Sequence, residues 1–209
     1  MMWLALAALL LVDPFWQTKS AKDWTDAELS QFLANSPWAQ MAAQPGKPQG
    51  GKNSGEGRLV QVYLATAEPV VKAVAERDRR LELRRPGITK ALADDPLSEE
   101  RAAWFADHRA AYIIVAARVG NNDAFSIEKE TGRMERESVM EAGRIQVQVS
   151  ATFPPTQTDP HLYLAFLREP VAASDKDISF GLYLPGVPAP YRTVTFKMKD
   201  MMVDGKPAM

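Results

Sequence analysis

YIIVAARV, residues 112–119, is rich in β-branched residues and predicts a strand at the centre of a sheet. Two other runs are apolar enough to be buried on much of both faces. One extends from Arg58 to Ala65 and the other from Leu162 to Leu167. We expect these three runs to form the buried part of the sheet.

The second half of the chain alternates apolar and polar residues, which is typical of strands with one buried face. Three segments follow this period, with apolar residues at Ile145, Val147 and Val149, at Ile178, Phe180 and Leu182, and at Val194, Phe196 and Met198. The Asp204-Gly205 pair that follows has the signature of a tight hairpin turn. Short strands at intervals of about 10 to 15 residues, separated by Pro and Gly, predict an antiparallel sheet.

Two helices are predicted between the first two strands. One extends from Glu68 to Arg85, with valines on its inner face and arginines on its outer face, and Pro86-Gly87 ends it. The other begins near Ser98 and continues to Arg109. This order predicts an α+β fold, a mainly antiparallel sheet with two to three packing helices, as a single domain over residues 58–209.

Residues 22–43 predict a helical segment that precedes this domain. Thr25 and Glu28 have the spacing of a capping box, and Trp24 before the cap has the position of a hydrophobic staple. Residues 44–57, QPGKPQGGKNSGEG, have the composition of a flexible linker. The segment is therefore expected to be a helical appendage, tethered to the domain.

An apolar run from Met2 to Val12 begins the chain. It is too short to cross a bilayer, which takes about 20 residues, but it has the length of the hydrophobic region of a signal peptide. We expect residues 1–21 to be a signal peptide, no integral membrane span after its cleavage, and export to the periplasm or cell envelope. No Lys or Arg precedes the run, and Lys19 stands where a small residue is preferred; a buried N-terminal helix and an uncleaved anchor are the alternatives.

The composition excludes several classes of protein. The chain has no cysteine, which excludes disulfides, iron–sulfur clusters, Cys-ligated zinc and thiol nucleophiles. Its 25 basic and 26 acidic residues nearly balance, so no global field favours nucleic acid. We expect no nucleic-acid partner.

No motif predicts a cofactor or a metal. Residues 46–53 approach a phosphate-binding loop, but Asn53 lacks the hydroxyl that ligates Mg²⁺, and no predicted strand precedes it. The two histidines, His108 and His161, have no partner at metal-ligand spacing. A Gly-x-Ser-x-Gly nucleophile motif is also missing from the sequence.

Two segments resemble a group of uncharacterised bacterial exported proteins. The first is DWT from Asp23, with SPWA from Ser36. The second is DKDISF from Asp175, with VTFKMKDMMVDGK over residues 194–206. The resemblance covers about a quarter of the chain and implies export. It implies no activity, cofactor or catalytic residue.

These observations favour an exported, non-catalytic binding or assembly module over an enzyme. Trp24, Phe32 and Trp38 are the candidate partner-binding residues, and another envelope protein is the candidate partner; the alternative role for these rings is to dock the helix onto the domain. A competing hypothesis is a small hydrolase or ligand-binding enzyme that uses Asp or Glu with His108 or His161. A third is carriage of a small apolar ligand in a curved sheet.

Overall fold

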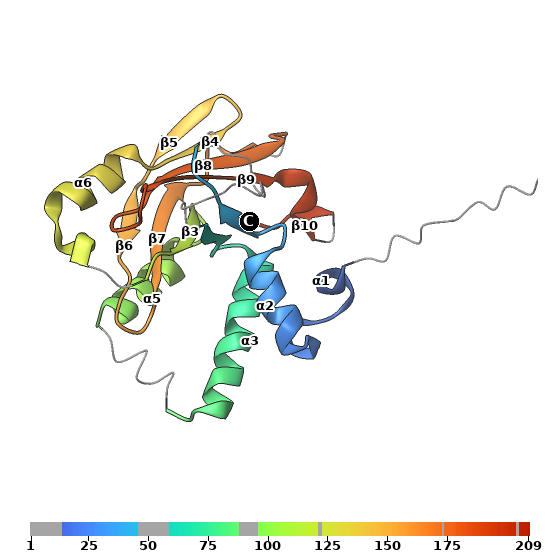
Figure 1. The fold of residues 1–209 in the computed structure, drawn as a ribbon. Helices are drawn as coiled ribbons and strands as arrows, with labels where there is room; N and C mark the ends of the chain where they lie inside the picture. The colour runs from blue at the N-terminus through green and yellow to red at the C-terminus, as the bar shows by residue number, and fades with distance from the viewer. Residues whose placement is uncertain (1–13, 46–58, 88–95, 121–122, 173, 204) are drawn as a thin grey trace, which may run out of the picture.

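The computed structural model describes residues 14–45, 59–87, 96–120, 123–172, 174–203 and 205–209. The predicted α+β class with antiparallel sheets is confirmed. The helices are α1 (Phe15–Thr18), α2 (Asp26–Ala34), α3 (Glu68–Arg84), α5 (Pro96–His108) and α6 (Glu128–Glu137), with 3-10 turns η1 (Ala21–Asp23), η2 (Asp123–Ser126) and η3 (Met198–Asp200). Figure 1 shows their arrangement around the strands.

The strands form two main sheets and a small hairpin. The first sheet has the order β1 (Ala39–Ala42), β2 (Val60–Leu64), β3 (Tyr112–Arg118), β7 (His161–Leu167) and β6 (Ala151–Phe153). The second has the order β5 (Ile145–Gln148), β4 (Val139–Ala142), β8 (Asp177–Tyr183) and β9 (Tyr191–Lys197). The hairpin pairs β10 (Met202–Val203) with β11 (Lys206–Pro207), as the Asp-Gly turn predicts.

The two sheets meet at both of their edges and surround one core. At one edge, only Val149 and Ser150 separate β5 from β6, so the chain passes directly from one sheet to the other. At the other edge, β1 and β9 are joined by a bridge between Ala43 and Thr193. Aromatic rings from the two sheets pack against one another inside, with Phe166 and Phe180 at 5.4 Å between ring centroids.

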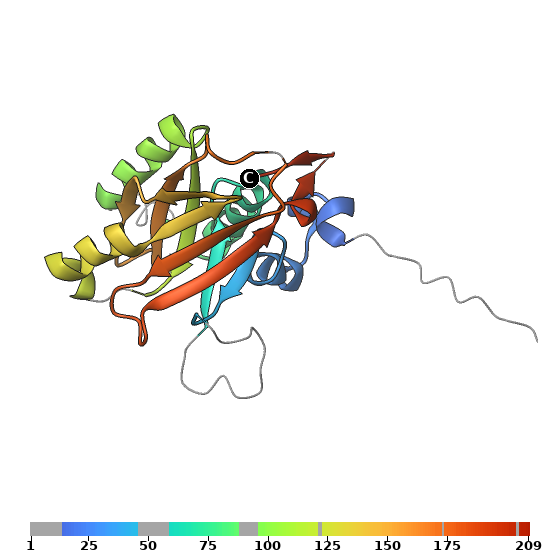
Figure 2. The same cartoon turned by 90° about the horizontal axis from the view of Figure 1, so that it is seen from above.

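Helices cover the outer face of the first sheet. Residues 113–117 of β3 and 161–166 of β7 are all buried, which requires cover on both faces, as the apolar runs predict. In β9, by contrast, buried and exposed residues alternate, so one face of the second sheet is solvated. Figures 1 and 2 show α2 and α3 side by side against the first sheet.

The segment predicted as an appendage is part of this fold. The predicted capping box of α2 is present, with Thr25 and Glu28 exchanging hydrogen bonds. The chain then forms β1, which pairs with β2 over four residues from Ala39 to Ala42. The predicted linker therefore connects two paired strands instead of tethering a separate element; its residues 46–57 lie outside the described ranges.

Part of the predicted signal peptide also packs on the domain. Phe15 of α1 lies edge-on to Trp24 at 5.2 Å, and Trp16 lies against Phe32 at 6.0 Å. Lys19 forms an ion pair with Glu28 at 2.5 Å. The apolar run itself, within residues 1–13, lies outside the described ranges. Among the described helices, none has the length and apolar composition needed to cross a bilayer.

Candidate functional site

The three rings predicted to bind a partner lie inside the core. Trp24 is 5% exposed, Trp38 is 1% exposed and Phe32 is fully buried. Phe32 lies 4.8 Å from Trp24 and 5.7 Å from Trp38 between ring centroids, so the three side chains pack on one another. The Trp38 indole also donates to the carbonyl of Ala208 at 2.5 Å. In this conformation they hold α2 on the domain and present no docking surface, which favours the alternative role for these rings.

His108 has a structural environment at the end of α5. Its ring stacks on Trp104 at 4.4 Å between centroids with an interplanar angle of 6°. Its Nδ1 lies 2.9 Å from the Trp104 carbonyl oxygen one turn earlier in the helix. No carboxylate hydrogen-bonds to it among the described residues, so it does not form the acid–base pair that the enzyme hypothesis requires.

His161, at the start of β7, does meet a carboxylate. Its Nδ1 lies 2.6 Å from Oδ1 of Asp159, which also accepts from the His161 backbone N–H at 3.1 Å. The other oxygen, Oδ2, accepts from the Tyr163 hydroxyl at 2.9 Å and pairs with Arg101 of α5 at 2.9 Å. Asp159 thus joins the helix to the sheet.

These partners keep the Asp159 carboxyl ionised. Burial raises the pKa of this carboxyl, but the hydrogen bond and charge of His161, together with Arg101, outweigh burial and bring its pKa to about 2. Burial raises the pKa of both Tyr63 and Tyr163 beside the pair. Burial thus favours the neutral form of both phenols.

A groove opens between the two sheets at the β1–β9 edge. The two strands run antiparallel and share the bridge at Ala43, whose N–H donates to Thr193 at 3.1 Å and whose carbonyl accepts from Thr193 at 2.8 Å. Beyond this pair the strands separate and leave a space of about 420 Å³. Its lining residues are Pro37, Gln40, Ala43, Thr193, Val194, Thr195, Lys197 and Asp200.

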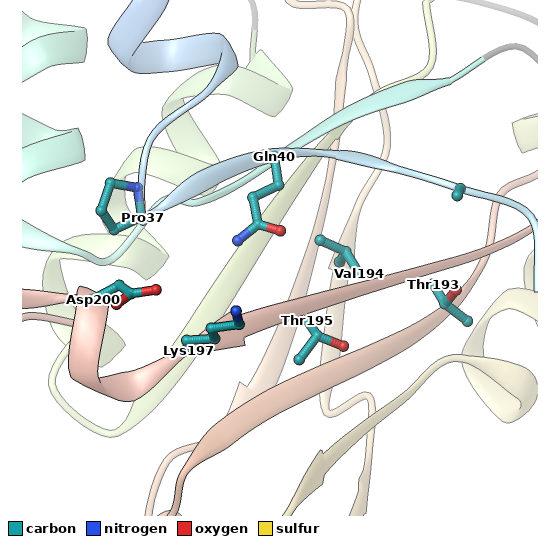
Figure 3. Close-up of a pocket in the computed structure, with 8 residues that line it drawn as sticks. Pro37, Gln40, Thr193, Val194, Thr195, Lys197 and Asp200 are labelled. Carbon is teal, nitrogen blue, oxygen red and sulfur yellow. The ribbon is translucent and has the colours of Figure 1, made fainter. Parts of the chain in front are cut away.

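The lining of this groove is mainly polar. Figure 3 shows the side chains of Gln40 from β1 and Lys197 from β9 pointing toward one another across the space. Asp200 lies at the wide end, in η3. Within the described part of the chain, neither Lys197 nor Asp200 forms an ion pair. The groove thus offers one cation, one anion and an amide to a ligand.

A second hollow of about 600 Å³ lies beyond η3. It is lined by Asp175, Lys176, Asp177, Lys197, Met198, Lys199, Met202 and Pro207. Lys197 borders both hollows and is the residue that they share. No group of three His, Asp or Glu side chains that could hold a metal ion occurs among the described residues.

Sequence patterns did not indicate the groove, since its residues come from segments about 150 positions apart. The Asp159–His161 pair does leave a local signal, because the two residues are separated in the sequence only by Pro160. The phosphate-loop-like residues 46–53 lie outside the described ranges.

Comparison with protein-family models, with curated proteins and with solved structures found no match to this chain.

Proposed function

We propose that this chain is an exported protein of the periplasm or cell envelope that acts as a non-catalytic binding or assembly module. The observation that carries the proposal is the polar groove between β1 and β9, about 420 Å³ in volume. The three rings predicted to bind a partner are buried, so we place the binding surface at this edge and not on α2. Export rests on the apolar run from Met2 to Val12 and on the resemblance of the chain ends.

The groove has the features of a specific ligand site more than of an adventitious gap. It is bounded by two strands whose positions are fixed by pairing to β2 and to β8. A site built on strands holds its polar groups more rigidly than a loop does. Lys197 and Gln40 supply a charge and an amide from the two sides.

Site-specific crosslinking in intact cells tests this function. A photoreactive residue placed at Gln40 is expected to crosslink to a partner, and the additional substitution Lys197→Glu is expected to abolish the adduct. A photoreactive residue at Gln146 is the matched control, since Gln146 is exposed on β5, at the opposite edge of the second sheet. Equal adducts at both positions, or none at Gln40, would contradict the proposal.

Fractionation tests the export component separately. The full chain is expected in the envelope or periplasmic fraction, and a chain without residues 2–12 in the cytosol. If both chains distribute alike, the apolar run does not direct export.

A small hydrolase remains the second candidate function, because one observation favours it. Asp159 orients His161 through Nδ1 at 2.6 Å, and Nε2 of the ring makes no hydrogen bond within the described part of the chain. Such a nitrogen can serve as a general base. Hydrolysis of p-nitrophenyl acetate that is lost in His161→Asn but kept in His108→Asn would support this candidate. Equal rates for the two variants would exclude a role for His161.

A further inference from the structure

The outer edge of β9 offers backbone groups to the groove. In an antiparallel pair, alternate residues bond to the neighbouring strand and the others point away from it. Thr193 bonds to Ala43, away from β8, so Thr195 directs its N–H and C=O groups, and Lys197 its N–H, away from β8 and toward the groove. Outside helices and strands, no backbone hydrogen bond joins Thr195 or the Lys197 N–H to another part of the described chain. Lys197 is the N-cap of η3, so its carbonyl faces that turn. Both backbone groups of Thr195 and the N–H of Lys197 are therefore open.

From this edge we propose that the groove binds an extended peptide segment of a partner protein, which adds to β9 as a further strand. This inference rests on the proposed function. Strand addition gains affinity from main-chain hydrogen bonds and specificity from alternate side chains. The bridge between Ala43 and Thr193 closes one end of the groove, so the added strand is short and enters from the end at Asp200.

The charges of the groove indicate the sequence of the segment. A residue directly opposite Lys197 places its side chain on the same face as this ammonium group, and opposite charges across a strand pair attract. The segment therefore carries Asp or Glu opposite Lys197. Two residues away, opposite Thr195, a β-branched residue fits the pleated surface best. Since Asp200 lies beyond Lys197, a basic residue follows toward the open end.

Substitution of Thr195 separates strand addition from other modes of binding. Thr195→Pro removes the N–H that faces the groove but none of the bonds to β8, and proline is tolerated at the outer edge of a sheet. Thr195→Val is the matched control, because it keeps the backbone and removes only the hydroxyl that contacts Ser179. A second variant, Lys197→Glu, tests the charge preference without a change in the backbone.

The probe is a phage-displayed library of random dodecapeptides, selected against the full chain. Selected peptides are expected to be rich in Asp or Glu, to bind about three- to tenfold more weakly to Thr195→Pro, and to bind Thr195→Val unchanged. Binding lost in Lys197→Glu should return when the acidic residue of the peptide is replaced by Lys. Strand addition is overturned if no peptide is selected, or if Thr195→Pro and Thr195→Val bind alike. If strand addition fails while Lys197→Glu still abolishes the crosslink from position 40, the proposed function stands with a partner that is not a strand.

Discussion

Single residues in this chain have roles that their types alone do not reveal. A tryptophan beside a short predicted helix is equally compatible with a docking surface and with a core. Trp38 belongs to the core because β1, whose first residue follows it, pairs with β2. That pairing joins segments separated by a polar stretch, and no local pattern predicts it. For His161, the sequence places its partner Asp159 only two positions away. No local pattern predicts the contact of Asp159 with Arg101 of α5.

Replacement of Trp38 by alanine tests its structural role. The side chain is 1% exposed, so Trp38→Ala is expected to lower the free energy of unfolding by about 3–5 kcal/mol. The control is Leu83→Ala on α3, where the side chain is 69% exposed and the change should stay within about 0.5 kcal/mol. Urea unfolding followed by fluorescence measures both. A stable Trp38→Ala variant that loses its partner would restore the partner-binding prediction.

Asp159 should make stability depend on pH. Its pKa is about 2 in the folded protein, below the usual value of 3.8, so the stabilisation is complete above about pH 5 and is lost as pH falls toward 2. Because the carboxyl is partly solvated, we expect an effect on the order of 1–2 kcal/mol. Urea unfolding of the natural chain and of Asp159→Asn should be measured at several pH values. The difference between their free energies of unfolding should shrink as pH falls over this interval. A difference that does not change with pH would exclude the ion pair as its cause.

Helices and strands with an amphipathic or a continuously apolar pattern are the ones that the sequence predicts correctly. The predicted helix from Glu68 corresponds to α3, and the β-branched run at 112–119 corresponds to β3. The sequence did not predict β1, β4 or α6. Residues 128–137 of α6 are almost entirely charged or polar, and Met134 is the one buried side chain of the helix, so no apolar stripe marks it. β1 and β4 have only four residues each, too few for a clear period.

Residues 15–19 are expected to remain in the folded protein. Cleavage after Ala21 would remove the Phe15 and Trp16 rings, the ion pair of Lys19, and the carbonyl of Lys19 that accepts from the Trp24 indole at 3.1 Å. The free energy of unfolding of a chain that begins at Lys22 should therefore be about 2–4 kcal/mol lower than that of a chain that begins at Pro14.

Thermal unfolding of the two chains measures this difference, and intact-mass analysis of the protein purified from cells locates its natural N-terminus. Equal stability together with a mature chain that starts at Lys22 would favour the predicted signal peptide of 21 residues over a boundary before Phe15.

For the whole molecule, the way the sheets close determines where binding can occur. The α+β class followed from the sequence because period-two strands dominate the second half of the chain. The closure did not follow, because it depends on how much each sheet twists and on which edges come together. One junction is continuous in the chain, between β5 and β6, whereas the other is a single bridge between Ala43 and Thr193. The groove is the part of this second junction that stays open.

Amide hydrogen exchange along β9, followed by NMR with and without a selected peptide, tests whether a strand adds to this edge. In the free protein, the amides of Val194 and Phe196, which face β8, should exchange slowly, and those of Thr195 and Lys197 should exchange fast. On binding, exchange at Thr195 and Lys197 should slow by about tenfold or more, because each amide gains a ladder hydrogen bond. Exchange at these two positions that is already slow in the free chain, or that the peptide leaves unchanged, would contradict strand addition at this edge.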